Sequence, residues 1–448
     1  MKWFRFQLRL YVVALSLGVF GIPAAPLWAQ PAARPNIVLI LADDVGWGDI
    51  GFNGRTSWRT PHMDRLAREG ALLRRFYTGA VVCAPSRGVL LTGKYTIHNG
   101  VRLNNEDLPA DQLTIAELLQ QHGYTTALFG KWHHGAPRVE GQSYVHPIDQ
   151  GFGEFFGFTD AREAWEKFPK QLWFGREQKP VEGYADDMFV DRAMQFIKAQ
   201  ADAQRPFFLY LPLISGHGRI LAVSDELEKH AGRFEEADPA KPLNATYAAM
   251  ITRFDTHVGR VMNLLDELKL SKNTLLVVTS DHGATFEVLN EGASFFHDSN
   301  APFRGQKRTL WEGGIRVPAA VRWPGVIPAG TVLDQPMHMM DLFPTIAAAA
   351  GVAPPSDLDG LNLLPAWKGE AALPERTLFW EWQSEGYNQL AAMRGDFKLV
   401  VTQGGRPELF DVVRDAAERR TLAPAQPKLA ERLKTELDQW IATARPHP

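Results

Sequence analysis

The sequence predicts an α/β fold with a large, doubly wound, mostly parallel sheet flanked by helices and a smaller C-terminal α+β domain, which holds an antiparallel sheet and a helix. Two observations predict it. Apolar runs typical of buried strands alternate with helical patterns over most of the chain, and this alternation stops near residue 347. The 448 residues are 45% hydrophobic and 22% charged, which excludes a disordered chain, a collagen-like rod and a multispan membrane protein.

Five apolar stretches are predicted to be strands buried on both faces. The first, Asn36–Ala42, is rich in β-branched residues and lies between Pro35 and Asp43, as expected of a central strand in a parallel sheet. Similar runs follow at residues 125–129, 207–213, 275–279 and 317–321.

Helical patterns lie between these runs. Thr60-Pro61 supplies an N-cap and a proline at the first helical position, and Thr114 with Glu117 matches a capping box. Residues 184–200 and 246–270 carry apolar residues at helical spacing. Residues 151–157 hold glycines near the spacing of a dinucleotide-binding loop, but no predicted strand precedes them, so we interpret this segment as an ordinary loop.

The segment 347–374 is rich in Ala, Pro and Gly and is predicted to be a hinge between two domains. We place the larger domain at residues 34–346 and the C-terminal α+β domain at residues 370–448. The C-terminal domain is expected to contain short strands at 377–382, 390–393 and 398–402 and a helix at 427–443.

The N-terminus resembles a secretory signal. Lys2, Arg5 and Arg9 precede an apolar run at 10–22, which is shorter than the about 20 residues needed to span a bilayer. We predict a signal peptide at residues 1–29, export to the periplasm or the medium, and no stable membrane span after cleavage. An uncleaved anchor is the alternative, because Leu27 fits a cleavage site poorly. The net charge of −3 shows no electrostatic footprint for nucleic acid.

Residues suited to metal binding or proton transfer follow four of the predicted strands. Because the carboxyl ends of parallel strands meet at one edge of a sheet, these residues are expected to share one site. Taken singly, each has a structural interpretation as a turn, a cap or a core histidine. They are Asp43 and Asp44, Lys131 with His133, His217, and Asp281 with His282.

The three carboxylates of Asp43, Asp44 and Asp281 would repel one another unless a cation held them together, and a hard divalent ion fits oxygen ligands. His282 as a further ligand adds nitrogen, which weakens the case for Ca²⁺ over Mg²⁺ or Mn²⁺. Several cations are predicted on the same rim, and with the metal they would form a pocket for a tetrahedral oxyanion ester. These cationic candidates are Lys131, His133, His217, Arg87 and Lys307.

Cys83 is the only cysteine, so an exported chain has no internal disulfide. A lone cysteine is often a small buried hydrophobe. Here, however, Pro85 is where a helix would begin, and a helix N-terminus favours an anion or an anionic nucleophile.

The sequence resembles the formylglycine-dependent sulfatases of the alkaline phosphatase superfamily. Their signature Cys-x-Pro-Ser-Arg followed by Leu-x-Thr-Gly is complete from Cys83 to Gly93, and their second signature matches residues 123–133. The similarity extends over nearly all of the chain after the signal, with further matches at 36–48, 304–307, 311–318 and 395–399.

The resemblance implies that a formylglycine-generating maturation enzyme oxidises Cys83 to formylglycine, whose hydrate is the nucleophile. It implies a metal, usually Ca²⁺, bound by position 83 together with Asp43, Asp44, Asp281 and His282. By the same resemblance Arg87 and Lys131 hold the hydrate and the sulfate, and His133 takes a proton as sulfate is expelled. His217 and Lys307 then flank the leaving oxygen.

The sequence departs from the family pattern at three places, and at one of them the segment around His217 lacks the Pro that often follows this histidine. Many members have Asn where this chain has His282, and His there also resembles relatives that cleave phosphonate monoesters or choline sulfate. Glu418-Arg-Arg-Thr-Leu differs from the usual Glu-x-x-Asn-Leu. Trp380 and Trp382 are candidates for stacking on a sugar or aryl ring, or for packing the domain junction.

The predicted function is therefore that of a sulfuric ester hydrolase acting on a sulfated saccharide or an aryl sulfate. A phosphonate or phosphate ester hydrolase on the same scaffold is the first alternative. A non-catalytic binder of sulfated glycans is the second.

Overall fold

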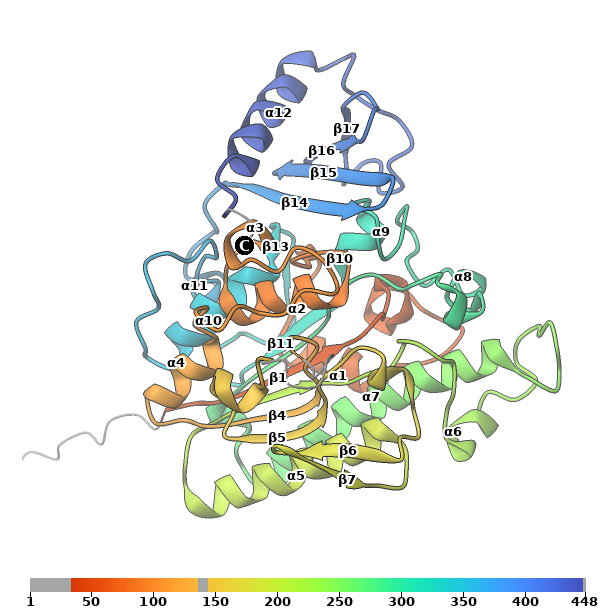
Figure 1. Ribbon diagram of the computed structural model, residues 1–448, viewed down its shortest axis with the longest axis vertical. Helices are drawn as coiled ribbons and strands as arrows, with labels where there is room; N and C mark the ends of the chain where they lie inside the picture. The colour runs from red at the N-terminus through yellow and green to blue at the C-terminus, as the bar shows by residue number, and fades with distance from the viewer. Residues whose placement is uncertain (1–33, 136–143, 446–448) are drawn as a thin grey trace, which may run out of the picture. The chain divides into compact units, whose positions relative to one another are not determined.

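The computed structural model describes residues 34–135 and 144–445, in which a ten-stranded sheet carries most of the secondary structure (Figure 1). The signal predicted for residues 1–29 lies outside the described residues. Strands β9, β1, β8, β4 and β5 are parallel neighbours. β11 pairs antiparallel with β9 and with β2, the outermost pair β12–β2 is parallel, and on the other side β6 and β7 are antiparallel. The order across the sheet is β12 (Thr331–Leu333), β2 (Ala71–Leu73), β11 (Ala319–Arg322), β9 (Thr274–Ser280), β1 (Asn36–Ala42), β8 (Phe207–Pro212), β4 (Thr125–Lys131), β5 (Glu154–Phe158), β6 (Gln171–Phe174) and β7 (Glu177–Pro180).

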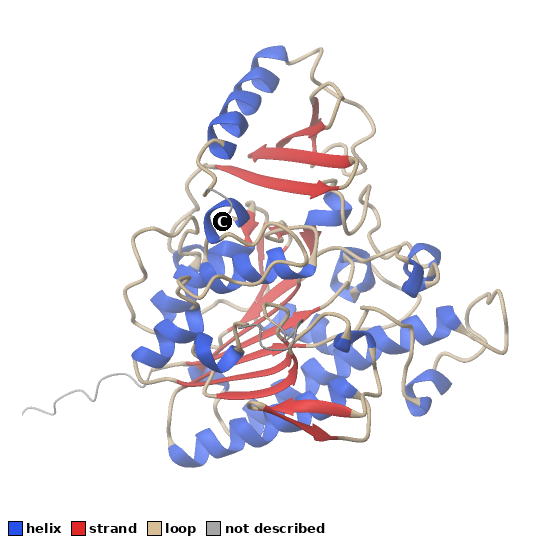
Figure 2. Cartoon of the chain, in the orientation of Figure 1, coloured by secondary structure: helices blue, strands red, loops and turns tan. Residues whose placement is uncertain are grey.

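Helices cover both faces of this sheet. Alternate side chains of its central strands point to opposite faces, and because both sets are apolar, both faces are buried under helices. In β1, Val38 and Ile40 pack toward α1 (Pro61–Glu69), α5 (Ala185–Ala203) and α7 (Leu243–Glu267). Ile37 and Leu39 pack toward the opposite group, which is α2 (Cys83–Thr92), α4 (Ile115–Gln121) and α10 (Leu342–Ala349). The predicted doubly wound α/β architecture is confirmed, and Figure 2 shows the two layers of helices.

The stretch predicted as one strand at 317–321 is two strands. β10 (Arg316–Val317) pairs with β3 (Phe76–Tyr77) in a three-stranded sheet completed by β13 (Met337–His338), whereas β11 belongs to the large sheet. Pro318 lies between β10 and β11, and it has no N–H to donate to a ladder. The segment predicted as a loop at 151–157 is also partly wrong, because β5 begins at Glu154.

The C-terminal part contains an antiparallel sheet with helix α12 (Pro427–Ile441) packed on it, as predicted (Figure 1). The sheet has four strands, one more than the three expected. Leu433, Leu437 and Trp440 are buried against the sheet in one apolar cluster, which also includes Tyr77 and Val81. The strands are β14 (Thr377–Ser384), β15 (Tyr387–Arg394), β16 (Phe397–Thr402) and β17 (Glu408–Asp411).

A buried ion cluster accompanies this packing. Nζ of Lys398 on β16 lies 2.9 Å from Glu312 and 2.7 Å from Glu418, and all three side chains are inaccessible to solvent. Glu312 is on α9 (Glu312–Ile315), which comes directly before β10, and its Oε2 accepts a hydrogen bond from Tyr77 Oη (3.0 Å). Glu418 also accepts from the main-chain N–H of Glu312 (2.7 Å). The cluster therefore connects the C-terminal sheet to the three-stranded sheet.

The remaining helices are short and lie in the connections. They are α3 (Thr96–Asn99), α6 (Ser224–Glu228), α8 (Ala293–Phe296) and α11 (Leu364–Trp367). Within the described ranges, no helix combines the length and the apolar character needed to cross a bilayer.

Candidate functional site

The four strand ends named above meet at one edge of the sheet, because β9, β1, β8 and β4 are consecutive parallel neighbours. All ten predicted site residues lie at or beside this edge, and all are buried. They are Asp43, Asp44, Cys83, Arg87, Lys131, His133, His217, Asp281, His282 and Lys307.

Cys83 is the first residue of helix α2, which brings its thiol to the strand ends. Sγ lies 3.5 Å from Oδ1 of Asp43 and 3.3 Å from Nε2 of His282. The helix begins two residues before Pro85, not at it as the sequence indicated, because extended Val82 is its N-cap and proline is tolerated within the first turn. The side chain at position 83 is only 1% exposed.

Two cations compensate the carboxylates beside Cys83. Nη2 of Arg87 lies 3.2 Å from Asp43 and 3.0 Å from Asp281, and Nζ of Lys131 lies 2.6 Å from Oδ2 of Asp43. Burial raises the pKa of Asp43, but the neighbouring charges of His217, Lys131 and Arg87 outweigh it and hold this pKa well below its usual range. Asp43 is therefore ionised over the ordinary range of pH.

Asp44 is less well compensated. Lys307 donates to its Oδ2 (3.2 Å) and also lies 3.0 Å from Oδ1, but Oδ1 accepts no hydrogen bond. Burial dominates and raises the pKa of Asp44 to about 6, although Lys307 and His282 lower it. A buried carboxylate oxygen without a hydrogen bond is costly, and a bound cation would remove that cost.

The residues around Asp44 fit a metal ion. One ligand atom each from Asp43, Asp44, Cys83 and His282 lies within 4.8 Å of the others. Asp281 lies against this group, with Oδ1 at 3.5 Å from Nε2 of His282. Three carboxylates and one imidazole suit a divalent ion with mixed oxygen and nitrogen ligands.

Two histidines adjoin the metal-ligand group. Nδ1 of His217 lies 4.0 Å from Oδ2 of Asp43. His133 follows β4, and burial first, then the charges of Lys131 and Arg87, hold its pKa well below the usual range. His133 and Asp44 have φ of 67° and 62°, a left-handed conformation that strains residues other than glycine and is often found at functional sites.

Sequence reasoning missed several residues that support this site. Glu287 lies 3.3 Å from Nζ of Lys307, and Asn104 accepts the main-chain N–H of Ala84 at the start of α2 (3.1 Å). Buried Lys167 donates to the carbonyl of Ile214, three residues before His217. No motif marks these positions, since each acts through contacts between distant segments.

The candidates for ring stacking, Trp380 and Trp382, are buried, and Nε1 of Trp380 donates to the carbonyl of Thr78 (2.8 Å). They pack the junction between the sheets, which was the alternative interpretation of these residues.

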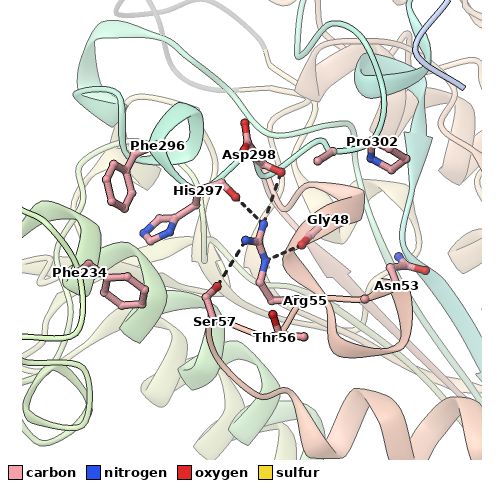
Figure 3. Close-up of a pocket in the computed structure, with 12 residues that line it drawn as sticks. Gly48, Asn53, Arg55, Thr56, Ser57, Phe234, Phe296, His297, Asp298 and Pro302 are labelled. Atoms are coloured by element: carbon pink, nitrogen blue, oxygen red, sulfur yellow. Dashed lines mark hydrogen bonds between the residues drawn. The ribbon is translucent and has the colours of Figure 1, made fainter.

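A cavity of about 540 Å³ lies in the loop after β1, and Arg55 is central to it (Figure 3). The guanidinium donates to the carbonyls of Gly48 (2.7 Å) and His297 (2.6 Å) and lies 4.4 Å from the ring centroid of Trp58. None of the ten site residues lines this cavity. Because the guanidinium of Arg55 donates to main-chain carbonyls of two separate segments, we interpret it as a structural residue that connects the loop of Gly48 to the loop of His297.

Comparison with known families gives two matches. The sulfatase family model matches residues 35–352, and the model described as N-sulphoglucosamine sulphohydrolase, C-terminal, matches residues 304–443.

Individual relatives and a solved structure are also similar to this chain. N-acetylgalactosamine-6-sulfatase of Canis lupus familiaris is 35% identical over 437 residues, which cover 89% of this chain and 74% of that protein. Steryl-sulfatase of Mus musculus is 32% identical, covering 98% and 86%. The crystal structure of Ps i-CgsB in complex with k-i-k-neocarrahexaose superposes with a TM-score of 0.82 at 28% identity, covering 92% of this chain and 94% of that one. With the family model matched along most of its length, this chain belongs to the sulfatase family and is a sulfuric ester hydrolase.

Proposed function

We propose that the protein cleaves the sulfate monoester of a saccharide, using formylglycine made from Cys83 and a divalent metal ion. One observation carries the proposal: the residue at the start of α2 contacts Asp43 and His282 in a buried group that also contains Arg87, Lys131 and Lys307. Relatives named N-acetylgalactosamine-6-sulfatase, and a similar structure in complex with k-i-k-neocarrahexaose, support a saccharide substrate.

The metal would be held by Asp43, Asp44, Asp281, His282 and position 83, with Ca²⁺ the expected ion and Mg²⁺ or Mn²⁺ the alternatives. Formylglycine would supply a hydrated aldehyde whose hydroxyl oxygen attacks sulfur, and the metal would stabilise negative charge on that oxygen and on the sulfate.

The remaining side chains would bind the sulfate or transfer protons, according to where they lie in the site. Arg87 and Lys131 would orient the sulfate and balance its charge, and Asp281 would draw off the proton of the attacking hydroxyl. His217 and Lys307 would donate a proton to the ester oxygen as its bond to sulfur breaks. His133 would then accept the second hydroxyl proton as sulfate leaves, which restores the aldehyde.

Maturation and export belong to the same proposal. Cys83 would be converted by a formylglycine-generating enzyme, and the N-terminal segment would direct the chain to the periplasm or the medium.

The experiment is expression with and without a formylglycine-generating enzyme, followed by mass spectrometry and assays. We expect the tryptic peptide 76–87 to be about 18 Da lighter in the active preparation, as SH on carbon becomes a carbonyl oxygen. The Cys83→Ala variant should be inactive. A fully active preparation that contains only unmodified Cys83 would contradict the proposed nucleophile.

Substrate comparison tests the reaction class. We expect turnover of 4-nitrophenyl sulfate and of N-acetylgalactosamine 6-sulfate to exceed turnover of a phenyl phosphonate monoester. His282 is the observation that favours the phosphonate alternative, because a histidine in the ligand group resembles relatives that cleave phosphonate monoesters. Faster turnover of the phosphonate would establish that alternative.

A further inference from the structure

We infer that Trp165 is the platform on which the sugar ring of the substrate stacks, directly beside His217. This deepens the proposed function and rests on it, because it names the group that recognises the alcohol side of the sulfate ester. The ten buried site residues are charged or titratable groups, suited to the sulfate and the metal, and none offers an exposed apolar surface to a ring.

Three contacts fix Trp165 beside His217. Lys167 donates to the carbonyl of Ile214, and Arg219 lies 3.0 Å from Glu166. Between these contacts, a Cβ built on Gly218 would lie 3.1 Å from Cα and 3.2 Å from Cδ1 of Trp165. The segment around Trp165 therefore packs along the loop that carries His217.

The position of Trp165 is also fixed from its own side. It ends the 3-10 helix η4 (Glu163–Trp165), whose Glu163 accepts main-chain hydrogen bonds from Thr159 (3.0 Å) and Asp160 (3.3 Å). Gly218 has φ of 69°, which disfavours other residues there, and a Cβ at this position would press closely on the indole. A ring held in this way loses little conformational freedom when a ligand stacks on it.

Exposure distinguishes Trp165 from the site itself. Trp165 is 36% exposed. His217, which is the neighbour in sequence of Gly218, the residue that Trp165 contacts, is only 4% exposed. A large aromatic surface left partly open beside a buried polar site is typical of a ligand contact.

The polar groups beside Trp165 favour a sugar over a sterol. The apolar C–H face of a pyranose can stack on the indole while its hydroxyls pair with Arg219 and Glu166, whose side chains are about half exposed. A sterol would cover the same indole, but its apolar rings would offer no hydrogen-bonding groups to Arg219 and Glu166.

The test separates the sugar site from the sulfate site. Trp165→Ala, Trp165→Phe and wild type are compared with N-acetylgalactosamine 6-sulfate and N-acetylglucosamine 6-sulfate as substrates. Inhibition constants are measured for the desulfated sugars and, separately, for inorganic sulfate. Phe174→Ala is the matched control, because Phe174 is 37% exposed but lies on β6, between β5 and the edge strand β7.

We expect Trp165→Ala to lower kcat/KM on the preferred sugar sulfate by roughly 10-fold or more, mainly through KM, as the loss of one aromatic contact predicts. The inhibition constant of the desulfated sugar should rise by a similar factor while that of inorganic sulfate stays unchanged. Trp165→Phe should restore part of the loss, and Phe174→Ala should behave as wild type.

Other outcomes overturn the inference in distinguishable ways. If wild type hydrolyses a sugar sulfate and Trp165→Ala matches Phe174→Ala, the platform is wrong and the proposed function stands. An equal rise in both inhibition constants would show that Trp165 supports the whole site and does not recognise the sugar. If wild type hydrolyses an aryl or steryl sulfate but neither sugar sulfate, the saccharide substrate itself is wrong, and the platform with it.

Discussion

The side chain of Arg87 connects several residues of the site by ion pairs and a hydrogen bond. Its guanidinium bridges Asp43 and Asp281, and Nη1 donates to the carbonyl of Lys131 (2.8 Å), so one side chain contacts the ends of three strands. Buried charges of one sign are stable only when such partners surround them. Arg87 compensates Asp43 and Asp281 in this way, whereas Oδ1 of Asp44 accepts no hydrogen bond.

Asp44→Asn should lower metal affinity and activity together, by roughly 10- to 100-fold, as is typical when a metal shell is disturbed. Isothermal titration with Ca²⁺, Mg²⁺ and Mn²⁺ measures the affinity, and the ion bound most tightly identifies the metal. Asp49→Asn is the control, because Asp49 is buried on the same loop but accepts hydrogen bonds from Tyr247 (2.7 Å) and Gly46 (2.9 Å). Unchanged ion affinity in Asp44→Asn would remove this residue from the metal site.

Lys307→Ala and His217→Ala test leaving-group protonation. If either residue donates a proton to the departing oxygen, its loss should slow poor leaving groups far more than nitrophenolate, by up to about 10²- to 10⁴-fold. The measurement is the slope of log kcat/KM against leaving-group pKa for a series of aryl sulfates.

Arg308→Ala is the control for that series, since Arg308 contacts Glu287 (2.6 Å) beside Lys307 and is partly exposed. Its slope should equal that of wild type. Slopes no steeper than wild type for both Lys307→Ala and His217→Ala would assign these residues to sulfate binding or to structure.

At the scale of helices and strands, sequence pattern predicted the elements with strong local signals. The central strands β1, β4, β8 and β9 were predicted to within one or two residues, and the capping box of α4 is present, with Thr114 accepting from Glu117 N (3.1 Å). Strand β7 has no such pattern, because it is polar and fully exposed. Its pairing with β6 comes from tertiary context that no local pattern records.

Because local sequence pattern does not record tertiary contacts, only part of the site could be predicted. Motif residues at strand ends could be identified because topology alone brings strand ends together. Trp165, Lys167 and Asn104 could not, since each is positioned by contacts between segments whose approach the sequence does not specify.

The pairing of helices α5 and α7 gives a prediction at this scale. Asp187 on α5 accepts two hydrogen bonds from Arg253 on α7 (2.9 and 2.6 Å) and lies 3.0 Å from Nε2 of His257. Burial raises the pKa of Asp187, but His257 and Arg253 outweigh it and hold this pKa below its usual range. Because the pKa is lower in the folded state, the ionised carboxylate stabilises the fold above its unfolded pKa, and this contribution is lost as pH falls through the folded pKa.

Asp187→Asn should therefore lower the free energy of unfolding by about 1 kcal/mol at pH 7, and the difference from wild type should shrink below about pH 4. Urea unfolding at several pH values measures it. Asp191→Asn is the control, because Asp191 pairs with Arg260 between the same helices but is more exposed. A difference for Asp187→Asn that is independent of pH would contradict the role assigned to its charge.

At the scale of the whole molecule, the C-terminal sheet is held by apolar packing and by the ion cluster of Lys398, Glu312 and Glu418. The C-terminal motif around Lys398, which matches the sulfatase pattern, is thus part of a structural junction. Burial raises the pKa of Glu418 to about 7, against the charge of Lys398. Removal of the lysine would leave Glu418 buried without this cation, and Glu312 with only the longer contact to Arg316, at 3.5 Å.

Lys398→Met should lower the free energy of unfolding by about 3–5 kcal/mol, the usual cost of breaking a buried pair from one side. Lys434→Met is the control, because Lys434 makes an exposed pair with Asp438 on α12 and should change stability by about 1 kcal/mol or less. Denaturant unfolding followed by circular dichroism compares the variants. Equal stability of the two would show that the cluster contributes nothing to the junction.

The burial of position 83 has a consequence for the order of events during synthesis. The thiol is 1% exposed once folded, and its partner His282 follows it by 199 residues. At a translation rate of about 5–20 residues per second, His282 leaves the ribosome some 10–40 s after Cys83. During that interval the strand β9 is missing, and position 83 cannot yet be enclosed. If Cys83 is modified as proposed, the maturation enzyme must reach this side chain before folding encloses it, and we expect slower folding to increase the yield of modified protein.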